Sequence, residues 1–213
     1  MNKALMSARG NVYRFLARIF ILEVDKKLLN DMKKMTFPES DESDIGDGYA
    51  KLKAYLAEAS EENIIDTEVD YAKVFLAAGE ATGLAAFPYE SIYTSKKKMM
   101  NESCTSDAEK YYAARGLKAK AGMYKIPDDH VGLEFEFMAV LCEEAASAAD
   151  SENEAAYEKA LKDQKEFFDR HIRKWVPVFC NDVIKYARTD FYKAVGMITR
   201  GFISQEAKVW DIL

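Results

Sequence analysis

Apolar and polar residues alternate along this chain mainly with the period of α-helices. From Leu5 to Leu22, apolar residues recur at steps of three and four positions and form one stripe. The clearest periodicity lies nearer the C-terminus, in Ala160, Leu161, Gln164, Phe167, Phe168, His171, Ile172 and Trp175. No stretch of useful length shows the two-residue alternation of a β-strand. Turn formers are few, with 10 glycines and 4 prolines in 213 residues. We therefore expect an all-α fold of roughly ten helices.

Capping patterns indicate where several of these helices begin and end. Residues 67–70, 106–109 and 151–154 resemble capping boxes, in which a Ser or Thr side chain and an acidic side chain satisfy free backbone N–H groups. Gly116 is expected to end a helix, and Pro177 to kink or end one. The segment from Leu133 to Cys142 is apolar around most of its circumference, which predicts a central buried helix.

Residues 117–127 are the best candidate for a hinge, because they are basic, contain Gly122 and end in a proline. They would divide a single helical domain, residues 1–213, into an N-terminal half (1–116) and a C-terminal half (128–213). A hinge of this kind would also allow two copies to exchange halves, so a monomer and a helix-swapped dimer both remain open.

Composition and charge exclude several classes of protein. The net charge of −6 disfavours nucleic-acid binding, which needs a basic surface. Two acidic stretches, 39–47 and 58–70, are interpreted as solvated surface, with attraction of a basic partner as the alternative. The three cysteines form no motif, as is usual in a reducing compartment. With neither a signal peptide nor an apolar run of about 20 residues, we expect a cytoplasmic protein without stable membrane insertion.

The segment 127–134 is the most informative for chemistry, because it places one of only two histidines beside two aspartates at the start of the apolar helix. An aspartate oxygen is expected to cap the helix, which would leave His130 at an exposed helix N-terminus within reach of a partner. Glu134 follows His130 by four residues and shares its face. An acid–base pair of His130 with Asp129 or Glu134 would suit a small helical enzyme, which we keep as an alternative function.

Other chemistry finds less support in the sequence. A carboxylate-bridged di-iron bundle would need Glu-x-x-His pairs, which are absent, and a zinc site would need more His or Cys ligands at local spacing. Phosphate-binding loops and nucleophile motifs are also absent. We therefore expect neither a metal nor a cofactor. His171, on an apolar stripe, is interpreted as a partly buried histidine that donates to a backbone carbonyl or carboxylate, rather than as a ligand.

Three blocks, in this order and spacing, resemble the TorD/DmsD family of cytoplasmic molybdoenzyme maturation chaperones, and more distantly NarJ. The first block is 71–75 with the loop 87–93, and the second is 127–134 with Phe137 and Met138. The third comprises Phe168, His171, Trp175, Pro177 and Phe179, followed by 191–192. With the N-terminal helix, the similarity spans nearly the whole chain. The loop departs from some members, which carry tryptophan near Pro88.

The resemblance implies an all-helical, non-catalytic chaperone. Its partners would be the twin-arginine leader peptide and the immature, cofactor-free body of a molybdopterin-dependent oxidoreductase, which it would hold until the cofactor is inserted. By position, the leader-binding residues would be Pro88, Tyr89, Glu90, Ser91, Tyr93, Asp129 and His130.

A leader joins a basic segment to an apolar stretch, so it needs carboxylates beside an apolar groove. Asp128, Asp129, Glu90 and Glu134 could supply the charge, and Phe87, Tyr89, Tyr93 and Met138 the apolar contact. Helix capping alone remains an alternative role for the two adjacent aspartates.

Overall fold

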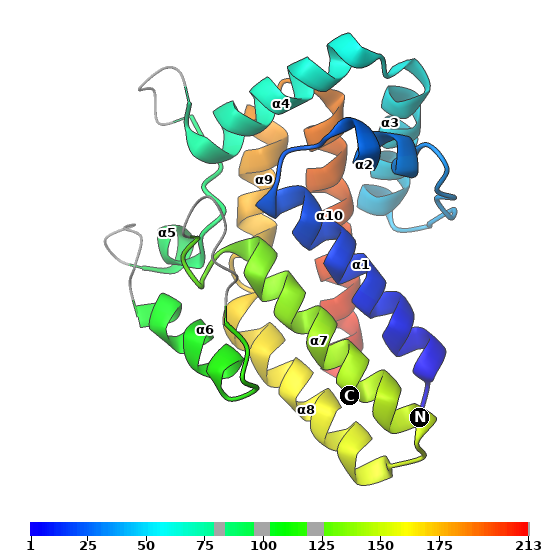
Figure 1. Cartoon of the computed structure of the whole chain (residues 1–213), viewed down its shortest axis with the longest axis vertical. Coiled ribbons are helices and arrows are strands. Elements are labelled where there is room, and N and C mark those ends of the chain that lie inside the picture. Colours follow the sequence, from blue (N-terminus) through cyan, green and yellow to red (C-terminus); the bar gives the residue numbers. More distant parts are fainter. Residues whose placement is uncertain (79–83, 96–102, 119–125, 213) are drawn as a thin grey trace. The chain divides into compact units, whose positions relative to one another are not determined.

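The structure is a computed structural model that describes residues 1–78, 84–95, 103–118 and 126–212, and it is built from helices (Figure 1). They are α1 (Lys3–Ile21), α2 (Lys26–Met32), α3 (Ser43–Glu58), α4 (Glu61–Leu76), α5 (Glu90–Thr94), α6 (Ser103–Ala113), α7 (Val131–Asp150), α8 (Glu154–His171), α9 (Val176–Tyr186) and α10 (Asp190–Ile212). The described ranges contain no strand, only one isolated bridge between Tyr89 and His130. The predicted all-helical class is confirmed.

The chain forms two compact units, each made of two segments. The first unit comprises Met1–Ile21 and Tyr89–Trp175, and the second comprises Leu22–Pro88 and Val176–Leu213. Residues on both sides of the predicted hinge therefore belong to the first unit. Most of that hinge, residues 119–125, lies outside the described residues, so the division into halves at 117–127 stays a prediction.

In the first unit, α7 packs against both α1 and α8. The predicted central helix is confirmed, because Phe135, Met138 and Leu141 of α7 have no solvent-exposed surface. A Cβ atom on Gly10 of α1 would lie 3.2 Å from the Cβ atom of Cys142, so a small residue is needed where these two helices meet.

One expectation for α1 was wrong, since Leu5 of the predicted stripe is 48% exposed. The buried face of the helix is rotated and includes Arg9, a charged residue. The Nη1 atom of Arg9 donates to the side-chain oxygen of Gln164 at 2.7 Å, and the Gln164 amide donates to the carbonyl of Leu141 at 3.0 Å. These hydrogen bonds compensate for burying the guanidinium, so a polar position belongs to the buried face.

In the second unit, α10 packs against α3, α9 and α4. The acidic stretch 39–47 is not wholly a loop, because α3 begins at Ser43. Asp44 accepts two hydrogen bonds from Arg200 of α10, at 2.7 and 2.6 Å, and this pairing lowers the pKa of the Asp44 carboxyl. At least one acid of this stretch is therefore part of the packing between helices.

The three predicted capping boxes were misplaced by two or more residues. The box of α4 is Ser60 with Asn63, so residues 67–70 lie within the helix. Helix α6 begins at Ser103, before the predicted 106–109, and Asn153 rather than Ser151 caps α8. The helix stops were better predicted. Gly116 has φ of +68° just after α6, and Pro177 lies in the first turn of α9, after α8 has ended.

Tertiary partners explain two of these errors. Asp70, predicted to close a capping box, accepts hydrogen bonds from the backbone N–H groups of Arg188 and Thr189 ahead of α10. Asp107 pairs with Arg170 of α8. A hydropathy search of the described helices finds none with the length and apolar character of a membrane span.

Candidate functional site

The segment 127–134 begins α7, but the cap of the helix is His130 and not an aspartate. The Nδ1 atom of His130 accepts a hydrogen bond from the backbone N–H of Gly132 at 3.0 Å, and the residue has extended backbone angles. An imidazole nitrogen thus takes the place of the carboxylate oxygen that we expected.

Asp129 instead holds the segment around α5. Its backbone carbonyl accepts from the N–H of Glu90 at 2.9 Å, and its Oδ2 atom accepts from the N–H of Ser91 at 3.0 Å. The rings of Tyr89 and His130 meet edge to face, 5.3 Å between centroids. Two of the sequence blocks, 87–93 and 127–134, therefore meet in the first unit through residues 89–91 and 129–130.

Gly132 is explained by the close approach of α1. A Cβ atom at this position would lie 2.3 Å from Cγ1 of Ile21 and 3.2 Å from the backbone oxygen of Ala17. Any side chain here would therefore push α1 away from the start of α7.

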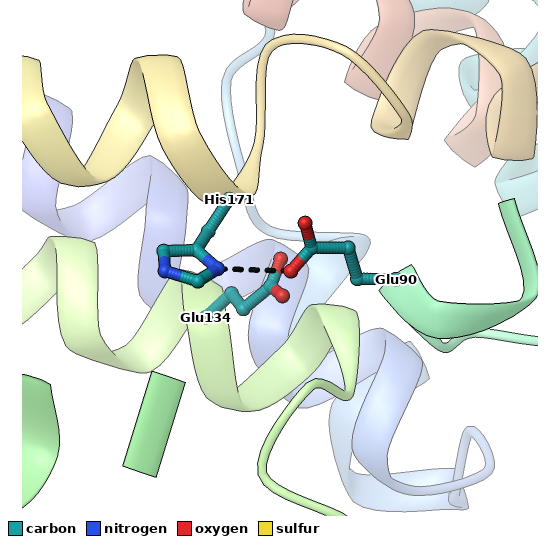
Figure 2. Close-up of side chains that lie close together, drawn as sticks. All are labelled: Glu90, Glu134 and His171. Atoms are coloured by element: carbon teal, nitrogen blue, oxygen red, sulfur yellow. Dashed lines mark hydrogen bonds and ion pairs between the residues drawn. The ribbon is translucent and has the colours of Figure 1, made fainter. Parts of the chain in front are cut away.

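Beneath this junction, three titratable side chains from three helices lie together in the interior (Figure 2). Glu90 comes from α5, Glu134 from α7 and His171 from α8, and each is at most 5% exposed. The Nδ1 atom of His171 lies 2.9 Å from Oε2 of Glu90. Trp175 donates its indole N–H to Oε2 of Glu134 at 3.2 Å. We call Glu90, Glu134 and His171 the buried triad.

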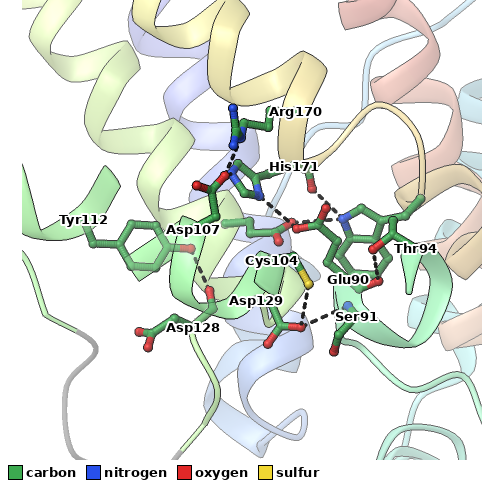
Figure 3. A network of polar contacts seen from close by, with 12 residues as sticks. Glu90, Ser91, Thr94, Cys104, Asp107, Tyr112, Asp128, Asp129, Arg170 and His171 are labelled. Atoms are coloured by element: carbon green, nitrogen blue, oxygen red, sulfur yellow. Dashed lines mark hydrogen bonds and ion pairs between the residues drawn. The ribbon is translucent and has the colours of Figure 1, made fainter. Parts of the chain in front are cut away.

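A second layer of polar contacts surrounds the triad (Figure 3). Asp107 of α6 places Oδ2 3.3 Å from Nε2 of His171, and the same oxygen pairs with Arg170. The hydroxyl of Tyr112 donates to the backbone carbonyl of Asp128 at 2.8 Å. Helix α6 therefore contacts both the triad and the segment that begins α7.

Burial dominates the electrostatics of the site. It raises the pKa of the Glu134 carboxyl well above its usual range, and the nearby carboxylates of Glu90 and Asp129 raise it further. Burial lowers the pKa of His130 to about 4, although the charge of Asp129 opposes this shift. His130 is therefore neutral at pH 7, with Nδ1 occupied by the Gly132 N–H. This arrangement does not favour an acid–base pair with Asp129.

The candidate binding residues divide by exposure. Asp129, His130, Glu134, Glu90 and Ser91 are buried, so the expectation of an exposed helix N-terminus at His130 was wrong. Residues 89–91 cover it, through the backbone and ring contacts already described. Tyr89, Tyr93 and Asp128 are partly exposed. Phe87, which is partly exposed, and Pro88, which is buried, belong to the second unit.

His171 bonds a carboxylate, one of the two partners predicted for it, and it is buried more completely than expected. Sequence reasoning did not identify Glu90 as the partner, nor Asp107 and Trp175 as members of the same cluster. The nearest signal was the helical spacing of His171 and Trp175, which places both on one face of α8 and its continuation.

A cavity of about 430 Å³ lies beside α7 in the first unit. Its walls are mainly apolar: Ile21, Tyr112, Leu117, Lys118, Ile126, Leu133, Glu136, Phe137 and Val140. Tyr112 lines this cavity and also donates to the backbone carbonyl of Asp128, so the cavity wall is joined to the segment that begins α7.

Comparison with known proteins gives matches over most of the chain. A family model described as nitrate reductase delta subunit matches residues 39–181. The chaperone protein TorD of Vibrio cholerae is 24% identical over 218 residues, covering 99% of this chain and 96% of the relative. TorD of Shewanella pealeana is 22% identical over an alignment that covers 94% of this chain and 88% of the relative. A solved structure described as a redox enzyme maturation protein from Archaeoglobus fulgidus has the same fold, with a TM-score of 0.54, 16% identity and coverage of 92% and 93%.

Proposed function

Because the chain belongs to the nitrate reductase delta subunit family, we propose that it is a maturation chaperone that binds the twin-arginine leader and the immature body of a molybdopterin oxidoreductase. It would hold this client in the cytoplasm until the cofactor is inserted. The observation that carries the proposal is the end-to-end similarity to proteins named as TorD chaperones, over 99% of this chain and 96% of the first relative.

We propose that the leader binds at the junction of α5 and α7. Tyr89, Tyr93 and Asp128 are accessible enough for direct contact, whereas Asp129, His130 and Glu90 hold the junction from beneath. This assignment divides six of the predicted residues into a contacting group and a positioning group.

The cavity beside α7 suits the apolar stretch of a leader, and nearby acids suit its arginines. Asp128 is held by Tyr112, a wall of the cavity. Glu136 lines the cavity, and burial raises the pKa of its carboxyl although the charge of Arg14 opposes this shift. An arginine beside Glu136 would stabilise the charged form of that carboxylate. An apolar wall with carboxylates at its edge matches a basic-then-apolar peptide.

A titration with a fluorescently labelled twin-arginine leader peptide tests the proposal. We expect Asp128→Asn and Glu136→Gln to weaken binding severalfold each, since a partly exposed ion pair contributes about 1 kcal/mol or less. Glu158→Gln, an exposed acid of α8, is the matched control and should leave affinity unchanged. A leader with both arginines replaced by glutamine should bind more weakly and lose most of its salt dependence.

Two outcomes would count against parts of the proposal. Equal affinity of wild type, Asp128→Asn and Glu136→Gln would move the leader site away from this junction. Failure to bind any twin-arginine leader, or any cofactor-free molybdopterin oxidoreductase from the same source, would remove the function itself.

A further inference from the structure

The buried triad has the composition of a metal-ion site. One imidazole and two carboxylates present ligand atoms that all lie within 4.8 Å of one another, and the three side chains enter from α5, α7 and α8 (Figure 2). Each side chain is at least nine-tenths buried. Because the ligands are anchored on three different helices, the packing of the first unit fixes their positions.

The triad also has an acceptor atom that its neighbours leave unsatisfied. Two carboxylates share the site, and His171 is the only member that can be positive. In the described part of the chain, Oε1 of Glu134 is buried without a hydrogen-bond partner. An ionised buried carboxylate is strongly unfavourable unless it is paired. A divalent cation would neutralise both glutamates and use the free oxygen of Glu134.

The second layer resembles the outer shell of known metal sites. Oδ2 of Asp107 lies 3.3 Å from Nε2 of His171, the nitrogen that faces away from the glutamates. Nε2 itself has no hydrogen-bond partner in the described residues, and Nδ1, which lies 2.9 Å from Oε2 of Glu90, is the nitrogen placed to bind a metal. Trp175 donates to Oε2 of Glu134 and so orients that carboxylate.

We propose that Glu90, Glu134 and His171 bind one divalent transition-metal ion of the Zn²⁺, Mn²⁺ or Fe²⁺ class. Nitrogen and carboxylate ligands suit these ions, while a single imidazole disfavours Ca²⁺ and Mg²⁺, which prefer oxygen alone. The ion would link α5 to α7 and α8. This role goes beyond leader recognition and does not depend on it.

Metal loading of the full-length, tag-free protein tests the proposal. Because the site is buried, the protein is both incubated with the ion and refolded in its presence, then separated from free ion by gel filtration. We expect one Zn²⁺ or Co²⁺ per chain. Bound Co²⁺ should give visible absorption bands and quench the fluorescence of Trp175, which is measured in a Trp210→Phe background so that it is the only tryptophan.

Variants show whether the triad is the site. Glu134→Gln and His171→Gln should weaken Zn²⁺ binding about 100-fold or more, since loss of an outer-shell partner alone weakens metal sites about 10- to 100-fold. Glu206→Gln, which changes a buried carboxylate of the second unit, is the matched control and should bind as wild type does.

Wild-type measurements keep the proposal testable even if a variant does not fold. Refolded wild-type protein that retains no Zn²⁺, Mn²⁺ or Co²⁺ after gel filtration would overturn it. Binding of Co²⁺ to the Trp210→Phe protein without any quenching of Trp175 would also overturn it, as would equal Zn²⁺ affinity in wild type and a folded Glu134→Gln variant.

Discussion

Nδ1 of His171 lies 2.9 Å from Oε2 of Glu90, and this contact joins α8 to α5 across 81 residues of sequence. Helix α5 has only five residues, too few to be stable alone. It is held in the first unit by His171 on its side chain and by Asp129 on its backbone. The position of Tyr89 and Tyr93, the proposed leader contacts, therefore depends on a buried polar network.

Removing Glu90 tests this dependence. We expect Glu90→Ala to lower the free energy of unfolding by about 3 kcal/mol, because it leaves His171 buried beside Asp107 without its other partner. Glu90→Gln preserves the length of the side chain and an acceptor oxygen, so its free energy of unfolding should fall by less than that of Glu90→Ala. Urea unfolding of the metal-free protein, followed by tryptophan fluorescence, measures both. Equal stability of Glu90→Ala and wild type would mean that this contact does not hold α5.

His130 should make the free energy of unfolding depend on pH. Its pKa is about 4 in the folded chain, against about 6.5 when unfolded, so between these values the unfolded state binds more protons. The stabilisation that comes from burying neutral His130 is therefore fully present above pH 6.5 and is lost as pH falls towards 4. The total change is on the order of 3 kcal/mol.

His130→Asn is the matched variant, because asparagine also caps helices and does not titrate. The difference in unfolding free energy between wild type and this variant should shrink as pH falls from 7 to 4, while contributions from other groups cancel. A difference that stays constant over that range would contradict the low pKa of His130.

Gly132→Ala should destabilise the first unit by about 1–3 kcal/mol, as overpacking does. The added methyl would meet Cγ1 of Ile21 at 2.3 Å and the backbone oxygen of Ala17 at 3.2 Å. Replacing Ile21 by alanine in the same chain removes the closer contact. The double variant should therefore lose less stability than the two single variants lose in sum. Thermal unfolding of the four proteins gives this coupling, and strict additivity would argue against the close approach.

Local periodicity was sufficient to predict most of the helices, but not α5, which begins within the predicted loop 87–93, and not the helix caps. Each helix has a buried face of its own, which a single segment reveals, as in the stripe from Ala160 to Trp175. A Ser or Thr three residues before an acid is also common within helices, and distant partners decided the outcome. Asp70 accepts a hydrogen bond from the backbone N–H of Thr189 just before α10, and Asp107 forms an ion pair with Arg170.

The candidate site was predictable only in part, for a related reason. The family resemblance implied that 127–134 and the loop 87–93 act together, and residues 89–91 do contact Asp129 and His130. It could not indicate that these contacts bury His130. Nor could spacing reveal the buried triad, because Glu90, Glu134 and His171 come from three helices and share no local motif.

Glu134 distinguishes a metal site from a merely protonated cluster. Its pKa is raised in the folded chain, so above the unfolded value of about 4.5 the folded state binds more protons. Without metal, its contribution to stability is full below that pH and falls as pH rises towards the folded pKa, by up to about 1.4 kcal/mol per pH unit. Glutamine resembles the protonated acid, so Glu134→Gln should become increasingly more stable than wild type as pH rises.

Zinc should make the wild type more stable than Glu134→Gln, the reverse of the order expected without metal. Bound Zn²⁺ stabilises only the folded state of a chain that has all three ligands, so the wild type should gain unfolding free energy with Zn²⁺ concentration and Glu134→Gln should not. Urea unfolding from pH 5 to 8, with Zn²⁺ or with a chelator, measures both effects. A stability advantage of Glu134→Gln that persists in Zn²⁺ would indicate that the triad binds a proton and no metal.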